Sequence, residues 1–163
     1  MFGKSKETSH DIAYLGLRNQ ALATTPSDIG LSLENNEQVY TAVVDIPISK
    51  EKIVSLVCFF DGTVSLYYST GGGLLGIGQK HESVRQAGGS FLYSAGQALK
   101  YLKKTSQYDL PDGDLAFVFL LTGDGVYKAE FNMSKIDKYE KPIQFLNFLI
   151  QNILCKIREN TTA

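Results

Sequence analysis

Hydrophobic residues recur along the chain with two different spacings, and the first of them is helical. Residues 9–24 place Ile12, Leu15 and Leu22 on one face, with Ser9 before them as a candidate cap, so we predict a helix there. Residues 25–30 then combine a cap residue, a proline and a final glycine, which is typical of one short helical turn.

The chain then changes to the two-residue period of β-strands. Apolar and polar positions alternate over residues 39–48, which predicts a first strand. Residues 53–60 are apolar on both faces, as expected for a central strand covered on both sides. Asp61-Gly62 is a two-residue hairpin signal that leads into a third strand over residues 63–69.

The second half of the chain repeats this change of period. A stripe of apolar residues with helical spacing predicts a helix over residues 83–103. A continuous apolar run predicts a strand at 115–121, and a tight turn leads to another at 126–131. The last helix is predicted to start near Pro142.

Two adjacent glycines lie in the first half of the helix predicted over residues 83–103. Gly88 and Gly89 are unusual because a glycine inside a helix costs about 1 kcal/mol relative to alanine. Small residues let another backbone approach closely. The approaching element is either the protein's own sheet or the same helix of a second subunit.

The order of these elements, α-βββ-α-ββ-α, predicts a single α+β domain over residues 1–163, with a mainly antiparallel five-stranded sheet. In element order it is similar to the profilin-like and roadblock-type domains, which act mostly as platforms for binding or dimerisation. The resemblance covers most of the chain but includes no diagnostic motif. It therefore transfers no functional residue to this sequence.

Composition narrows the class of protein further. The chain is 44% hydrophobic and 20% charged, as expected for a folded globular domain, and its net charge of −1 argues against nucleic-acid binding. The first residues are polar, so we expect no secretory signal. Apolar runs are too short to cross a bilayer, so we expect no membrane partner and a cytoplasmic location.

One stretch has a pattern that binds anions in other proteins. Five glycines fall between a predicted strand and a predicted helix: Gly71, Gly72, Gly73, Gly76 and Gly78. Such a loop can bring backbone amides close to an anion. The spacing nevertheless matches neither the P-loop nor the dinucleotide-binding fingerprint.

The residues after the loop keep an anion site open. Ser83 has capping-box spacing and is predicted to cap the following helix, with Lys80, His81 and Arg85 close to its positive end. A small anion or nucleotide, or a substrate, is therefore one interpretation. We predict no catalytic residue, no metal and no cofactor, because no further motif supplies them.

The apolar residues of the same loop favour other interpretations. Leu74, Leu75 and Ile77 are unusual in a phosphate-binding loop. They suit a connector that folds onto the core, or a loop that contacts another protein.

Several remaining residues have simpler structural interpretations. Cys58 and Cys155 are predicted to be buried free thiols. Asp45 lies on the polar face of the first strand with Thr41, so we expect it to face solvent. Phe148 widens the apolar face of the last helix, which predicts a cover from the first helix or from a partner subunit.

Taken together, these patterns predict a non-enzymatic protein-interaction or regulatory module, whose partner is another protein or a second copy of this chain. The alternative is a binder of a small anionic ligand, or an enzyme, centred on the glycine-rich loop.

Overall fold

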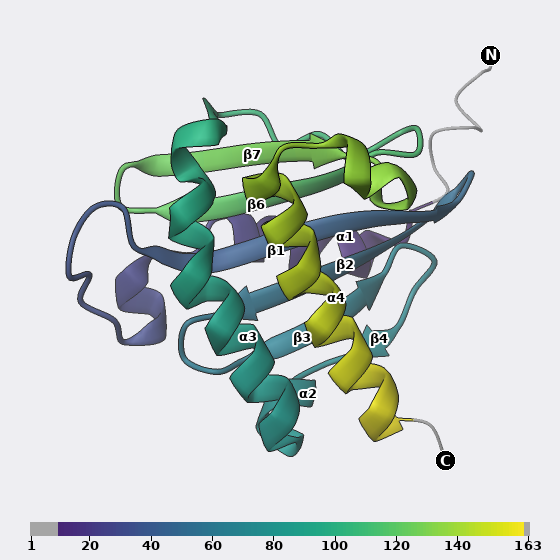
Figure 1. The fold of residues 1–163 in the computed structure, drawn as a ribbon. Helices are drawn as coiled ribbons and strands as arrows, with labels where there is room; N and C mark the ends of the chain where they lie inside the picture. The colour runs from purple at the N-terminus through teal and green to yellow at the C-terminus, as the bar shows by residue number, and fades with distance from the viewer. Residues whose placement is uncertain (1–9, 162–163) are drawn as a thin grey trace.

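The computed structural model describes residues 10–161 and contains one antiparallel sheet with helices on both faces (Figure 1). The α+β class is confirmed. The sheet has seven strands in the order β4-β3-β2-β1-β6-β7-β5. Their bounds are β1 Val39–Ser49, β2 Lys52–Phe59, β3 Val64–Tyr68, β4 Gly73–Leu74, β5 Lys103–Thr105, β6 Ala116–Thr122 and β7 Gly125–Phe131.

The predicted number of five strands is wrong because two short edge strands carry no periodic signal. β4 lies inside the glycine-rich loop and pairs with β3, opposing Leu74 to Leu66. β5 lies where the sequence predicts the end of a helix, and it pairs with β7. Strands of two or three residues are too short to show alternation, so only pairing with a neighbour defines them.

The three predicted long helices begin within a few residues of the predicted positions, but the one predicted over residues 83–103 ends as an α-helix at Ala95 and continues as a 3₁₀ segment. The structure contains α1 (Ile12–Leu22), α2 (Ile77–Lys80), α3 (Glu82–Ala95) and α4 (Lys141–Thr161), and 3₁₀ segments η2 (Pro26–Ile29), η3 (Gly96–Tyr101) and η4 (Met133–Lys138). Asp11 caps α1, accepting a hydrogen bond from the Ala13 amide at 3.1 Å. The predicted cap, Ser9, lies outside the described residues.

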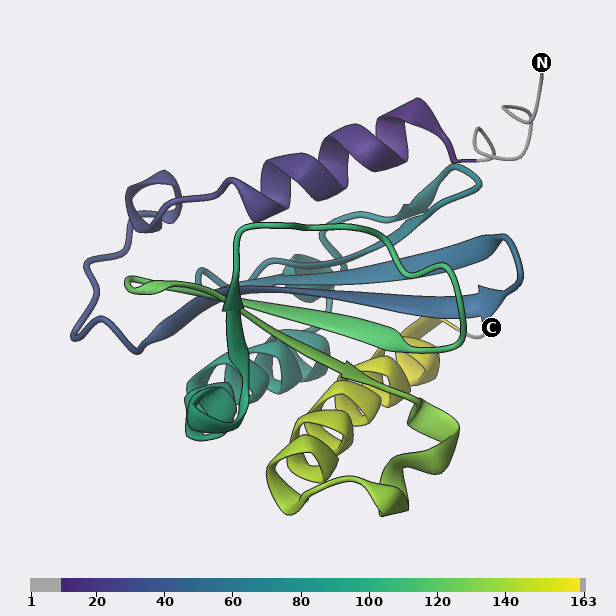
Figure 2. The same ribbon diagram turned by 90° about the horizontal axis from the view of Figure 1, so that it is seen from above.

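The elements form three layers. α3 and α4 lie side by side on one face of the sheet, and α1 lies on the other face (Figures 1 and 2). Each face has its own apolar core: the larger one lies under α3 and α4, and the smaller one lies under α1 and the connector at residues 106–115. β1 and β2 are buried on both faces because they are central in this arrangement.

The position of α1 overturns the prediction for Asp45. This residue is 0% exposed, because the polar face of β1 is covered by α1 instead of by solvent. Arg18 of α1 pairs with it at 2.7 Å. A carboxylate buried in this way needs such a partner, since an unpaired buried charge is strongly unfavourable.

The two helix glycines have different surroundings. A Cβ atom at Gly88 would lie 2.6 Å from Val64 Cγ2 of β3, so this glycine allows the helix to approach the protein's own sheet. A Cβ atom at Gly89 would meet nothing within 4 Å. Close packing inside the chain therefore explains Gly88 but not Gly89.

The last helix packs on the sheet and against α3, with one surface left open. α1 lies on the opposite face of the sheet, so it does not cover α4 as the sequence allowed (Figure 2). Phe148 is 66% exposed as a result. Cys58 is buried as predicted, whereas Cys155 on α4 is half-buried.

Candidate functional site

The glycine-rich loop forms a tight turn, the edge strand β4 and the short helix α2. The amide of Gly71 donates to the carbonyl of Tyr68 at 2.8 Å, which closes the turn. A Cβ atom at Gly73 would overlap the backbone carbonyl oxygen of Leu66, so strand pairing requires glycine here. Gly72 also has a positive φ, of 81°. The first half of the loop is therefore shaped by its pairing with β3.

The second half of the loop packs onto the β2–β3 turn. A Cβ atom at Gly78 would lie 2.6 Å from the carbonyl oxygen of Gly62, which leaves no room for a side chain. The amide of Gly76 donates to Ser65 Oγ at 2.9 Å. These glycines allow close approach between segments of the same chain.

The structure places the predicted anion-binding residues around the junction of α2 and α3. His81 is the residue before α3, so the prediction that Ser83 caps this helix is wrong. Ser83 lies inside the helix, and its Oγ accepts a hydrogen bond from Asn160 of α4 at 2.9 Å. The amides of Val84 and Arg85 donate to the carbonyl of His81, both at 3.1 Å. These two amides, on which the anion interpretation depended, are engaged within the chain.

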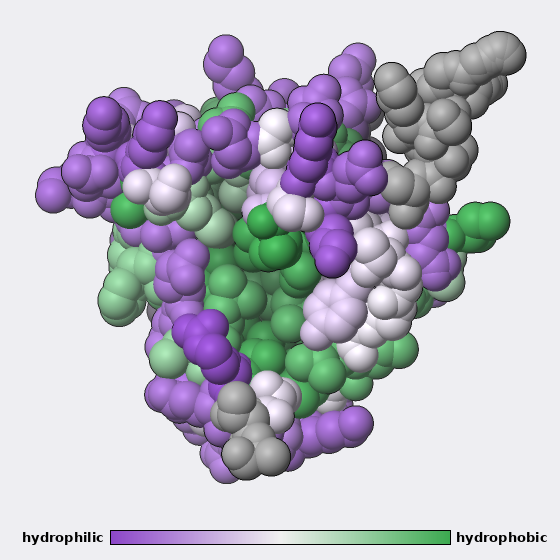
Figure 3. Space-filling model, turned by 90° about the vertical axis from the view of Figure 1, so that its right-hand side faces the viewer, coloured by the Kyte–Doolittle hydropathy of each residue, from purple (hydrophilic) through white to green (hydrophobic). Residues whose placement is uncertain are grey.

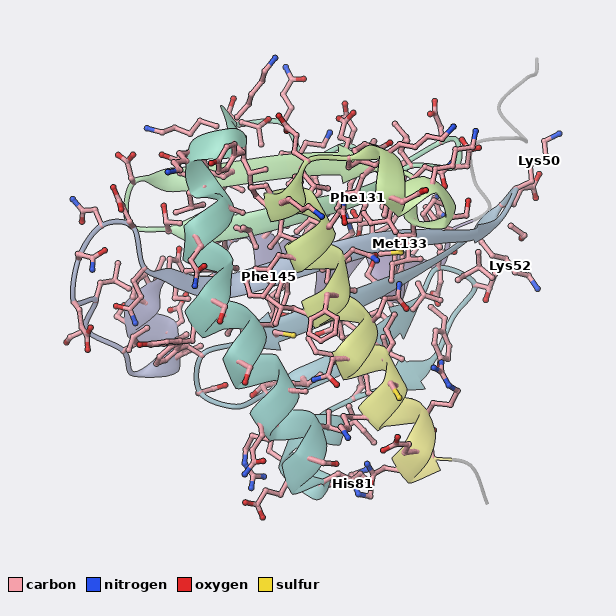
Figure 4. The ribbon with its side chains drawn as sticks, viewed as in Figure 1. Lys50, Lys52, His81, Phe131, Met133 and Phe145 are labelled. Carbon is pink, nitrogen blue, oxygen red and sulfur yellow. The ribbon has the colours of Figure 1, made fainter. Side chains whose placement is uncertain are left out.

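The basic side chains of this region do not converge on one point. Arg85 Nη1 donates to the carbonyl of Gly78 at 3.1 Å and its aliphatic part packs beside Gly62. Lys80 is exposed, and His81 is half-buried at the start of α3 (Figure 4). The apolar residues also divide: Ile77 is buried, Leu74 is half-buried and Leu75 is 57% exposed.

A buried polar network lies under α1. Arg18 binds Asp45 through Nε, 3.1 Å from both carboxylate oxygens, and through Nη2. Ser55 donates to Asp45 at 2.6 Å, and Tyr14 donates to Ser55 at 2.7 Å. Arg18 also reaches the carbonyl of Asp109 at 3.4 Å. The network thus joins α1, β1, β2 and the connector before β6.

The Tyr14 hydroxyl is strongly affected by this environment. Burial raises its pKa to about 12, and the nearby carboxylate of Asp45 adds to the rise. Burial alone raises the pKa of the Cys58 thiol to about 12. Both groups therefore stay protonated near neutral pH, and Ser55 links the Tyr14 hydroxyl to the Asp45 carboxylate. The network has the character of a structural link between elements.

An apolar hollow lies on the opposite face, where the strands extend beyond α4. Figure 3 shows it as a depression lined by hydrophobic side chains on the side of the molecule beside α4. Its members are half-buried and pack against the larger core: Ile46 of β1, Val54 of β2, Tyr68 of β3, Leu74 of β4, Met133 of η4 and Leu154 of α4. We call this set the apolar hollow.

Strand register creates the floor of the apolar hollow. Ile46 lies opposite Val54, and Val54 lies opposite Tyr68, so these side chains form a row across three strands. Met133 contributes to the wall and lies beside α4, where Gln151 contacts its sulfur at 3.6 Å (Figure 4). The hydrophobic pattern predicts each of these three strands. The row is left uncovered because of where α4 crosses the sheet, which the sequence pattern does not specify.

Two further structural properties bear on function. Within residues 10–161, no helix combines the length and apolar character needed to cross a membrane. The same residues include no group of three or more His, Cys, Asp or Glu side chains that could hold a metal ion.

Comparison with protein-family models, with curated proteins and with solved structures finds no match to this chain. The likeness in element order to profilin-like and roadblock-type domains therefore remains a prediction. Function has to be inferred from the geometry of the chain itself.

Proposed function

We propose that this chain is a non-enzymatic protein-binding module and that the apolar hollow is its binding site. The carrying observation is the half-buried apolar row Ile46–Val54–Tyr68 beside Leu154 and Met133. Single exposed hydrophobic residues are normal on a protein surface. A contiguous apolar surface rimmed by polar residues is instead typical of an interaction site.

The energetic argument concerns the surface that remains in contact with water. Each Å² of apolar surface removed from water contributes about 25 cal/mol, so covering several half-exposed side chains together supplies a driving force for association. These side chains extend from regular strands and a long helix. A partner can thus bind them with little loss of conformational freedom in the site.

The proposal covers a regulatory module that binds another protein, and it also covers a homodimer in which the partner is a second copy of this chain. Either form places an apolar surface of a second chain over the hollow. Binding of a small anion at the glycine-rich loop is not advanced as a second function, because the amides of Gly71, Gly76, Val84 and Arg85 are engaged within the chain.

Site-specific photocrosslinking in cells that express the protein tests this function. A photoreactive residue at Leu154 is expected to give a protein adduct of defined mass, and Val54→Glu is expected to remove that adduct by placing a charge on the floor. Ile12 is the matched control position, since it is 85% exposed on α1, on the other face of the sheet. Equal adducts from Leu154 and Ile12, unchanged by Val54→Glu, would contradict the proposal.

A further inference from the structure

The apolar hollow has the position and direction of a further helix on the sheet. α3 and α4 cross the same face side by side, and the hollow lies next to α4 on the side away from α3 (Figures 1 and 3). Its floor runs across the strands, from Ile46 through Val54 to Tyr68, as the two helices do. A helix placed alongside α4 would cover this row.

The size of the floor fits a short helix. Neighbouring strands lie about 4.8 Å apart, so the floor together with Leu74 of β4, which lies opposite Leu66 of β3, spans roughly 14 Å across four strands. A helix rises about 1.5 Å per residue, and about ten residues cover that distance. Packed helices lie about 8–10 Å apart, so such a helix would contact Leu154 of α4 and the floor together.

The residues that border the hollow are mainly basic. Lys52 precedes Val54 by two positions in β2 and therefore lies on the same face of the sheet. Lys135 lies on η4, two residues after Met133. Figure 4 shows Lys50 and Lys52 at the tip of the β1–β2 hairpin, on the side of the hollow.

Acidic residues on the segments that border the hollow are fewer than the basic residues there. Glu51 lies between Lys50 and Lys52, and Asp137 lies between Lys135 and Lys138. On α4, Glu159 pairs with Lys156 at 3.6 Å. The border of the hollow is thus basic, although the chain as a whole has a net charge of −1.

We propose that the apolar hollow binds an amphipathic helix of a partner protein, with acidic residues of that helix facing Lys52 and Lys135. This inference rests on the proposed function, because it takes the hollow as the binding site. The apolar face of the helix packs on the floor beside α4. Its carboxylates face the basic border, which favours this partner over helices flanked by lysine.

Two designed peptides test the class of partner. Both have about 14 residues and the same leucine positions at helical spacing, but one carries glutamate and the other lysine beside the apolar face. Fluorescence anisotropy with the full chain is expected to show at least about tenfold tighter binding of the glutamate peptide, which corresponds to about 1.4 kcal/mol.

Variants assign that binding to the hollow. The double variant Lys52→Glu, Lys135→Glu changes two exposed residues and is expected to weaken binding of the glutamate peptide at least about tenfold. Leu154→Gln is expected to weaken binding of both peptides. Lys103→Glu is the control charge reversal on β5, at the opposite edge of the sheet, and is expected to leave binding unchanged. Circular dichroism establishes that each variant is folded.

Four results would overturn the inference. The first two are equal binding of the two peptides and binding of neither peptide. The third is binding of the glutamate peptide that no variant of the hollow weakens, and the fourth is another kind of partner in the hollow. Concentration-dependent dimerisation lost in Leu154→Gln would identify a second copy, and binding to phosphatidylserine vesicles lost in that variant would identify a membrane surface. A protein adduct from Leu154 without peptide binding would reject the acidic helix while retaining the proposed function.

Discussion

Among individual residues, Arg18 has the largest expected effect on stability. It is 2% exposed and supplies the cation that pairs with the fully buried carboxylate of Asp45. The Arg18→Ala variant is expected to lose about 3–5 kcal/mol of unfolding free energy, because Asp45 remains buried without its partner. Urea denaturation measures the change.

A double replacement distinguishes the cost of an unpaired charge from the loss of packing. Arg18→Met combined with Asp45→Leu removes both charges and keeps apolar volume, so it is expected to be more stable than Arg18→Ala. A double variant as unstable as Arg18→Ala would show that the ion pair itself is required.

Gly88 and Gly89 are adjacent in α3 but have different surroundings, so alanine at the two positions is expected to have opposite effects on stability. Gly88→Ala places a methyl group 2.6 Å from Val64 Cγ2 and is expected to cost about 1–3 kcal/mol. Gly89→Ala meets nothing within 4 Å and is expected to stabilise the helix by about 1 kcal/mol. Thermal or urea unfolding of the two variants tests this, and similar losses at both positions would contradict the assigned surroundings.

Among the elements, the glycine-rich loop forms an edge of the sheet that pairs with β3. The amides of Gly71, Gly76, Val84 and Arg85 donate hydrogen bonds within the chain. We therefore expect inorganic phosphate and nucleotides to leave the melting temperature unchanged, in the native chain and in Lys80→Ala alike. Differential scanning fluorimetry measures this. A phosphate-dependent rise in the native chain that Lys80→Ala abolishes would instead support the anion-binding interpretation.

At the scale of the whole molecule, buried protonated groups make the fold sensitive to high pH. Burial raises the pKa of Tyr14 to about 12 from an ordinary value of 10.0, and that of Cys58 to about 12 from 9.0. The unfolded chain releases these protons first. The stabilisation that these two groups contribute is therefore complete below about pH 9 and is lost as the pH rises towards 12.

Urea denaturation between pH 8 and pH 12 tests this expectation. Tyr14→Phe removes one of the two groups, so its stability should fall less steeply with pH than that of the native chain. The slope separates this effect from the loss of the Ser55 hydrogen bond, which lowers stability at every pH. A native chain whose stability stayed constant up to pH 12 would contradict the prediction.

The elements predicted correctly are those whose sequence signal is local. Alternation predicted β1, and a run of residues apolar on both faces predicted β2. The Asp61-Gly62 turn predicted the hairpin to β3, and helical spacing predicted α1 and α4. From these came the α+β class. The period of apolar residues is a property of each segment alone, so it can be read without knowing what the segment packs against.

Which faces are covered depends on packing between distant segments, so it became visible only in the folded chain. Asp45 is buried because α1 lies over it, Ser83 bonds to α4 instead of capping α3, and β4 exists through its pairing with β3. The apolar hollow arises in the same way, since α4 crosses the sheet and leaves the ends of the strands open beside it. Coverage depends on the relative placement of distant segments, and hydrophobic periodicity does not encode that placement.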